Sequence, residues 1–189
     1  MFLSLDLKRY RGDLWRGVRP FDGADVFSRW ALGRLLPVST IHPEEEISLW
    51  LGLMVVRGGR VAVLDYGRRH VGLLGMESFE MAEGVPPAER RLGEALRWLG
   101  RRVRDEWRLR PFEGVPRFLA WIHDPWTPEN RDRLALVAVW EVPGDAEAEG
   151  APLRWWSQEE LDGVRPDAWV GFSRWVPGLL RLNESARQV

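Results

Sequence analysis

The stretch that decides the fold is Gly100–Arg110, which reads GRRVRDEWRLR. It closes a segment, starting near Pro87, in which apolar residues recur every three or four positions. That period is typical of one helical stripe, and a proline in the first turn suits a helix start, so the sequence predicts a helix over about 87–109. Two adjacent acids, Asp105 and Glu106, stand among its arginines. They are either metal ligands or part of a solvated, salt-bridged helix face.

The segments around this helix predict strands. Two apolar, β-branched runs, ISLWLGLMVV and RVAVLDYG, flank Gly58–Gly59 and indicate a β-hairpin. Downstream, RFLAWIHD, RLALVAVWEV and LRWW indicate three more strands, and the adjacent Trp155 and Trp156 should face opposite sides of the last one. Ser157 with Glu160 three residues later is a capping box that opens a short helix. The tail predicts a terminal helix that packs three aromatic residues, Trp169, Phe172 and Trp175.

The chain divides into an N-terminal extension, residues 1–46, and a domain over residues 47–189 that includes the C-terminal helix. The extension alternates arginines with aromatic residues. These aromatics could stack on the bases of a nucleic acid, but we expect them to pack on the body of the protein. Within it, Val26–Leu35 has roughly helical spacing and Pro37 would end the helix.

Composition excludes several classes of protein. The 189 residues carry a formal net charge of -1, which gives no electrostatic reason to expect nucleic acid as a partner. The absence of cysteine excludes disulfides and thiolate metal sites. The sequence contains no long apolar run that could span a membrane and no early apolar region of a signal peptide, so we expect a cytoplasmic protein. No P-loop or dinucleotide fingerprint occurs, so we expect no organic cofactor.

The order of these elements resembles a Nudix hydrolase domain over about residues 47–165. The family motif is G-x5-E-x7-R-E-U-x-E-E-x-G-U, where U is aliphatic and the glutamates hold a divalent metal. The positions that fit are Arg101, Val103, Asp105 in place of the first paired glutamate, Glu106 and Leu109. The positions that depart from the motif are Pro87 for glycine, Gly93 for glutamate, Arg102 for glutamate and Arg108 for glycine. The resemblance implies an α/β fold: a Nudix-like mixed β-sheet sandwiched by helices, with the N-terminal extension added.

The resemblance also implies a metal site, and Arg102 alters it. Asp105 and Glu106 would be ligands for Mg²⁺, and either could be catalytic, but Arg102 lies at ion-pair spacing from both and would take the place of the cation. Additional carboxylates could restore the site, with Glu80 as a metal ligand, Glu83 as a catalytic residue and Glu141 from a late strand.

Two functions follow. The first is a Nudix-like protein with a degenerate motif that binds a nucleotide-type ligand or a protein partner without efficient hydrolysis. The alternative is a divergent active Nudix hydrolase, a pyrophosphohydrolase that cleaves a nucleoside-diphosphate-linked substrate with Mg²⁺. Candidate ligand-binding residues are Arg101, Arg102, His123 and Trp126. The 12 tryptophans make a homodimer a further expectation.

Overall fold

The computed structural model describes residues 2–6, 16–22, 34–36, 46–78, 88–109, 114–147 and 152–188. Its strands are β1 Phe2–Asp6, β2 Gly17–Pro20, β3 Arg34–Leu36, β4 Glu46–Arg57, β5 Arg60–Asp65, β6 His70–Val71, β7 Leu74–Ser78, β8 Arg117–His123, β9 Arg133–Glu141 and β10 Leu153–Trp156. Its helices are α3 Ala88–Trp107, α4 Gln158–Asp162 and α5 Val176–Ser185, with short 3-10 helices η2 Pro128–Asn130, η3 Pro166–Ala168 and η4 Gly171–Trp175.

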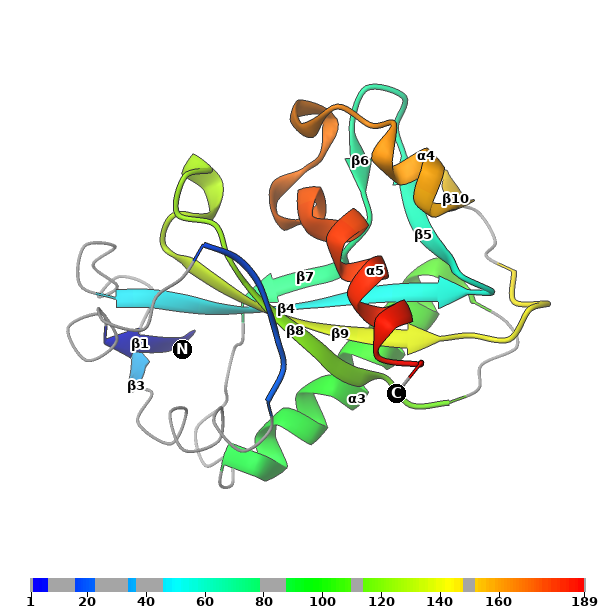
Figure 1. The fold of residues 1–189 in the computed structure, drawn as a ribbon. Helices are drawn as coiled ribbons and strands as arrows, with labels where there is room; N and C mark the ends of the chain where they lie inside the picture. The colour runs from blue at the N-terminus through cyan, green and yellow to red at the C-terminus, as the bar shows by residue number, and fades with distance from the viewer. Residues whose placement is uncertain are drawn as a thin grey trace.

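The strands form one mixed sheet in the order β10-β5-β4-β9-β8-β2 (Figure 1). The central pair, β4 and β9, is parallel and runs in register from Ser48 opposite Arg133 to Val56 opposite Glu141. The pairs β4–β5, β8–β9 and β2–β8 are antiparallel. The β4–β5 hairpin turns at Gly58 and Gly59, which both have positive φ, as the sequence predicted.

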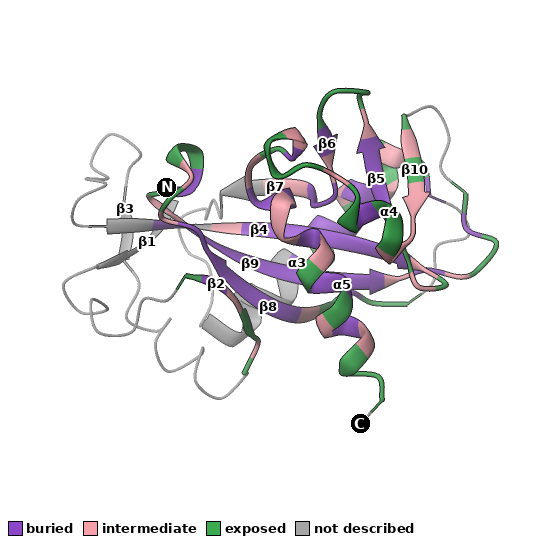
Figure 2. Ribbon diagram, turned by 45° about the horizontal axis from the view of Figure 1, so that its top comes forward, coloured by how far each residue is buried: buried purple, intermediate pink, exposed green. Residues whose placement is uncertain are grey.

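Side chains on the two faces of the sheet form two separate cores. Along β9 the residues alternate, so that Leu136 and Trp140 belong to the core beneath α3, whereas Val137 and Val139 belong to the core beneath α5. We call these the α3-side core and the α5-side core. All four side chains are buried, because helices cover both faces of the central strands (Figure 2). The predicted α/β sandwich is therefore confirmed.

The C-terminal strand shows the same alternation on a smaller scale. Trp155 packs against the α3-side core and Trp156 against the α5-side core, as expected for neighbours on a strand. The helix that follows begins with the predicted capping box: Ser157 Oγ accepts from the Glu160 backbone N–H, and Glu160 Oε2 accepts from the Ser157 backbone N–H at 2.7 Å. The hydrogen bond that the Ser157 backbone N–H donates to the Glu160 carboxylate lowers the pKa of Glu160, and the Ser157 side chain lowers it further.

Three sequence expectations differ from the structure or extend beyond it. The end of the helix predicted over Val26–Leu35 is wrong, because Arg34–Leu36 forms strand β3, which pairs with β1; residues 23–33 lie outside the described residues. The terminal helix starts only at Val176, so Trp169 lies before it. Trp169 instead forms an isolated β-bridge with His70. Strands β1 and β2 of the predicted extension are hydrogen-bonded to β4 and β8. The division of the chain after residue 46 stays a prediction.

Candidate functional site

Helix α3 ends at the position where the Nudix motif has its last glycine. Arg108, the residue aligned with that glycine, has φ 46, a left-handed conformation that a side chain disfavours. The next backbone N–H, of Leu109, donates to the carbonyl of Arg104 at 3.2 Å, and Leu109 itself is buried in the α3-side core. This hydrogen bond spans six residues and is typical of the Schellman motif at a helix C-terminus. The residue with positive φ in that motif, here Arg108, is usually glycine. The backbone thus fits the register proposed from the sequence although Arg108 departs from the motif.

Replacing Arg108 by glycine should stabilise the protein. Glycine adopts positive φ without a steric penalty, so we expect Arg108→Gly to raise the free energy of unfolding by about 1 kcal/mol. Urea denaturation would measure the change. As a control, Arg97→Gly, at an exposed position inside the same helix, should lower the free energy of unfolding by about 1 kcal/mol. Equal losses in both variants would contradict the assigned helix ending.

Asp105 and Glu106 of α3 are exposed, and each is paired with an arginine. Asp105 Oδ1 accepts from Arg104 Nε at 2.7 Å, and this hydrogen bond lowers the pKa of Asp105. Glu106 Oε2 lies 3.8 Å from Arg102 Nε, at the i,i+4 spacing that the sequence predicted. The Arg102 guanidinium also lies 5.5 Å from the centre of the Trp98 ring. A cation in solution therefore meets carboxylates that already have positive neighbours.

The third carboxylate that could have completed the site lies elsewhere. Glu141 follows Trp140 on β9, so its side chain is on the α5 face, opposite Asp105 and Glu106. The expected contribution of Glu141 to a metal site on α3 is therefore wrong. Glu80 and Glu83 lie outside the described residues. Within the described ranges, no cluster of three or more histidine, aspartate or glutamate residues could hold a metal ion. The described carboxylates alone do not fit a Mg²⁺ cage, which needs several oxygen ligands in octahedral geometry.

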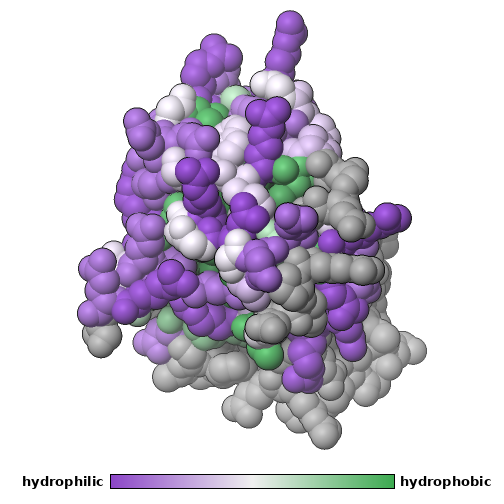
Figure 3. Space-filling view, turned by 90° about the vertical axis from the view of Figure 1, so that its right-hand side faces the viewer, coloured by the Kyte–Doolittle hydropathy of each residue, from purple (hydrophilic) through white to green (hydrophobic). Residues whose placement is uncertain are grey.

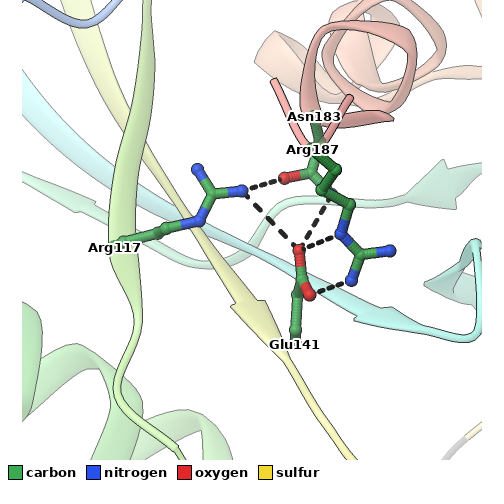
Figure 4. Close-up of polar contacts among 4 residues, drawn as sticks. All are labelled: Arg117, Glu141, Asn183 and Arg187. Atoms are coloured by element: carbon green, nitrogen blue, oxygen red, sulfur yellow. Dashed lines mark hydrogen bonds and ion pairs between the residues drawn. The ribbon is translucent and has the colours of Figure 1, made fainter. Parts of the chain in front are cut away.

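Glu141 instead joins the sheet to the C-terminal helix (Figure 4). Its Oε1 accepts from Arg187 Nε at 2.8 Å and from Asn183 Nδ2 at 3.3 Å, and a second ion pair joins its Oε2 to Arg187. Arg117 at the start of β8 lies 3.6 Å from the same carboxylate and donates to Asn183 Oδ1 at 2.6 Å. This network is a structural link between β8, β9 and α5.

The candidate ligand-binding residues lie in two places. Arg101 and Arg102 lie next to Gly100, where a Cβ atom would come within 3.2 Å of Pro116, just before β8 begins. His123 is at the other end of β8, about 20 Å away at the usual strand rise, and Trp126 lies in the turn beyond it. His123 is buried, whereas Trp126 is exposed. One small ligand would not contact both groups.

Sequence reasoning missed the polar cluster in the turn between β8 and β9. Asp124 is fully buried, and its Oδ2 accepts from Thr127 Oγ1 at 2.7 Å and from Trp175 Nε1 at 3.3 Å. Arg174 Nη1 lies 3.7 Å from the same oxygen and donates to Thr127 Oγ1 at 2.7 Å. Two of the partners of Asp124, Arg174 and Trp175, come from η4, far along the chain, so no local pattern in the sequence could have indicated them.

The arrangement of elements, with α3 and α5 on opposite faces of a mixed sheet, defines a Nudix-like α/β sandwich. The crystal structure of Tm1382, a candidate Nudix hydrolase, matches 97% of this chain and 98% of its own, with a TM-score of 0.73 and 16% identity. The solution structure of the E. coli ORF135 protein matches 80% of this chain and 96% of its own, with a TM-score of 0.39 and 14% identity. No protein-family model and no curated protein matches the sequence. This chain has a Nudix-like fold.

In the part of the chain that the structure describes, no helix is both long and apolar enough to cross a membrane.

Proposed function

We propose that this chain is a Nudix-fold protein that binds a nucleotide-type ligand without efficient pyrophosphate hydrolysis. The observation that carries the proposal is the ion pair between Arg102 and Glu106, at 3.8 Å. Arg102 stands where the motif has a metal-binding glutamate, so one ligand is replaced by a positive charge. This exchange removes an oxygen ligand and raises the electrostatic cost of bringing Mg²⁺ to Asp105 and Glu106.

A second observation favours a small ligand over a protein partner. Among the described tryptophans, only Trp98 and Trp126 are exposed, and most of the others pack in the two cores. The face at the carboxyl ends of β4 and β9 presents mainly hydrophilic side chains (Figure 3). Stable protein interfaces usually have a contiguous apolar centre. The exposed tryptophans are separate and form no such centre.

The proposal predicts how the protein responds to metal. In a calorimetric titration with Mg²⁺ and Mn²⁺, the native protein should bind more weakly than millimolar. Arg102→Glu restores a carboxylate and removes the competing guanidinium, so we expect it to bind at least about tenfold more tightly. Arg97→Glu makes the same charge change at an exposed position earlier in the same helix and should leave metal binding weak.

The same Mg²⁺ titration can contradict the proposal. Millimolar or tighter Mg²⁺ binding by the native protein, abolished in Glu106→Gln, would favour the divergent hydrolase with Asp105 and Glu106 as ligands. Measuring phosphate or nucleotide release from a nucleoside-diphosphate-linked substrate with and without Mg²⁺ would then test hydrolysis directly. Equal metal affinity in Arg102→Glu and Arg97→Glu would show that overall charge, and not the position of Arg102, controls binding.

A further inference from the structure

The turn between β8 and β9, residues 124–132, carries the most exposed aromatic ring among the described tryptophans. In Figure 1 it is the loop at the upper left that rises above the start of β4. The Trp126 side chain is 72% exposed, and the Arg16 guanidinium lies 5.6 Å from the centre of its ring. A guanidinium over an indole is a favourable cation–π contact, and the ring keeps enough open surface for a second planar group.

Arg174 contacts the same turn. Its Nη1 donates to the hydroxyl of Thr127, the residue after Trp126, at 2.7 Å and lies 3.7 Å from the buried carboxylate of Asp124. Within the described ranges, its Nε and Nη2 contact no acceptor, and the side chain is 34% exposed. Thr127 and the buried Asp124 orient the guanidinium, and its N–H groups that have no acceptor among the described residues could bind an anion.

The local charge balance also suits an anion. Within the turn Glu129 and Arg131 have opposite charges, and Asp132 is paired at 3.8 Å with Arg133, the first residue of β9. Arg174 offsets Asp124, and Arg16, which forms no ion pair with another described residue, adds a positive charge at the ring. A ligand with one planar ring and a phosphate would therefore meet a stacking surface and two guanidinium groups.

We infer that Trp126, Arg16 and Arg174 form a binding site for a mononucleotide-sized ligand, with the base on Trp126 and the phosphate on the guanidinium groups. The site lies on the side of η4, whose aromatic residues belong to the α5-side core, so it is separate from the acids of α3. One exposed ring accommodates one base, which favours a single nucleotide over a strand of nucleic acid. This inference rests on the proposed ligand class and assigns that ligand a site away from the altered motif.

Calorimetry with ADP in metal-free buffer tests the site. Loss of base stacking in Trp126→Ala should weaken ADP binding about 5- to 100-fold. Trp98→Ala removes the other exposed tryptophan, on α3, and should leave the affinity unchanged. Arg174→Gln should weaken ADP binding about tenfold or more and leave the binding of adenosine, which has no phosphate, unchanged.

Four results would overturn the inference. They are the absence of ADP binding by the native protein at millimolar concentration, unchanged affinity in Trp126→Ala, equal losses for ADP and adenosine in Arg174→Gln, and binding of a single-stranded oligonucleotide without binding of ADP. The Mg²⁺ titration of Arg102→Glu involves no nucleotide, so a failure of the altered metal site and a failure of this nucleotide site are distinguishable.

Discussion

Replacing Gly75 with alanine is expected to lower the free energy of unfolding by about 2–4 kcal/mol. Gly75 in β7 has φ 60, and an added Cβ would lie 2.7 Å from Leu99 Cδ1 and 3.1 Å from Val103 Cγ2. Both contacts are with the buried stripe of α3, which packs on the sheet and has little room to move. The substitution therefore adds backbone strain and a steric overlap at the same position. Urea denaturation of the two proteins would measure the loss.

A second glycine separates these two effects. Gly58, in the β4–β5 turn, has φ 54, and an added Cβ would meet nothing within 4 Å. Gly58→Ala should therefore lower the free energy of unfolding by the cost of the backbone strain alone, about 1 kcal/mol. If Gly75→Ala costs no more than Gly58→Ala, the close packing of α3 against β7 is wrong.

The second large effect is expected at Asn183 in α5. This side chain is fully buried, accepts a hydrogen bond from Arg117 at 2.6 Å and donates one to Glu141 at 3.3 Å. Hydrogen bonds to charged groups are stronger than neutral ones, although the partial exposure of Arg117 and Glu141 weakens them here. We expect Asn183→Ala to lower the free energy of unfolding by about 2–3 kcal/mol, measured by urea denaturation.

The matched control for Asn183 is Ser185, two residues later in the same helix and exposed. Ser185→Ala should change the free energy of unfolding by no more than about 0.5 kcal/mol, because it breaks only a local hydrogen bond to the Arg181 carbonyl. Similar values for the two variants would mean that the network around Glu141 does not contribute to stability.

The features that the sequence predicted correctly rest on local signals. Paired glycines at 58 and 59 indicate a hairpin because both positions need positive φ, and Ser157 with Glu160 indicates a helix start because the two residues cap each other's backbone. The apolar period before Arg108 predicts a helix because one stripe of it must reach the core. Each of these signals lies within a few residues of the structure that it predicts.

The features that the sequence did not predict depend on contacts between distant segments. The face occupied by Glu141 follows from the register of β9 against β4 and β8, which the spacing of carboxylates along the chain does not contain. Asp105 pairs with its neighbour Arg104, although helix spacing alone favoured Arg102. Asp124 contacts Trp175 and Arg174 only when η4 packs against the β8–β9 turn. Site geometry therefore had to come from the tertiary structure.

The parallel pairing of β4 with β9 has a consequence for how the chain reaches its native state. Ser48, at the start of this pairing, bonds to Asp132, 84 positions later, so the centre of the sheet closes only after a long loop has been brought together. Such non-local pairing slows folding, because chain entropy is lost before the contacts form. During synthesis, β4 emerges well before β9 with an apolar edge that β9 has yet to cover. We expect this edge to be the segment of the nascent chain most exposed to misassociation.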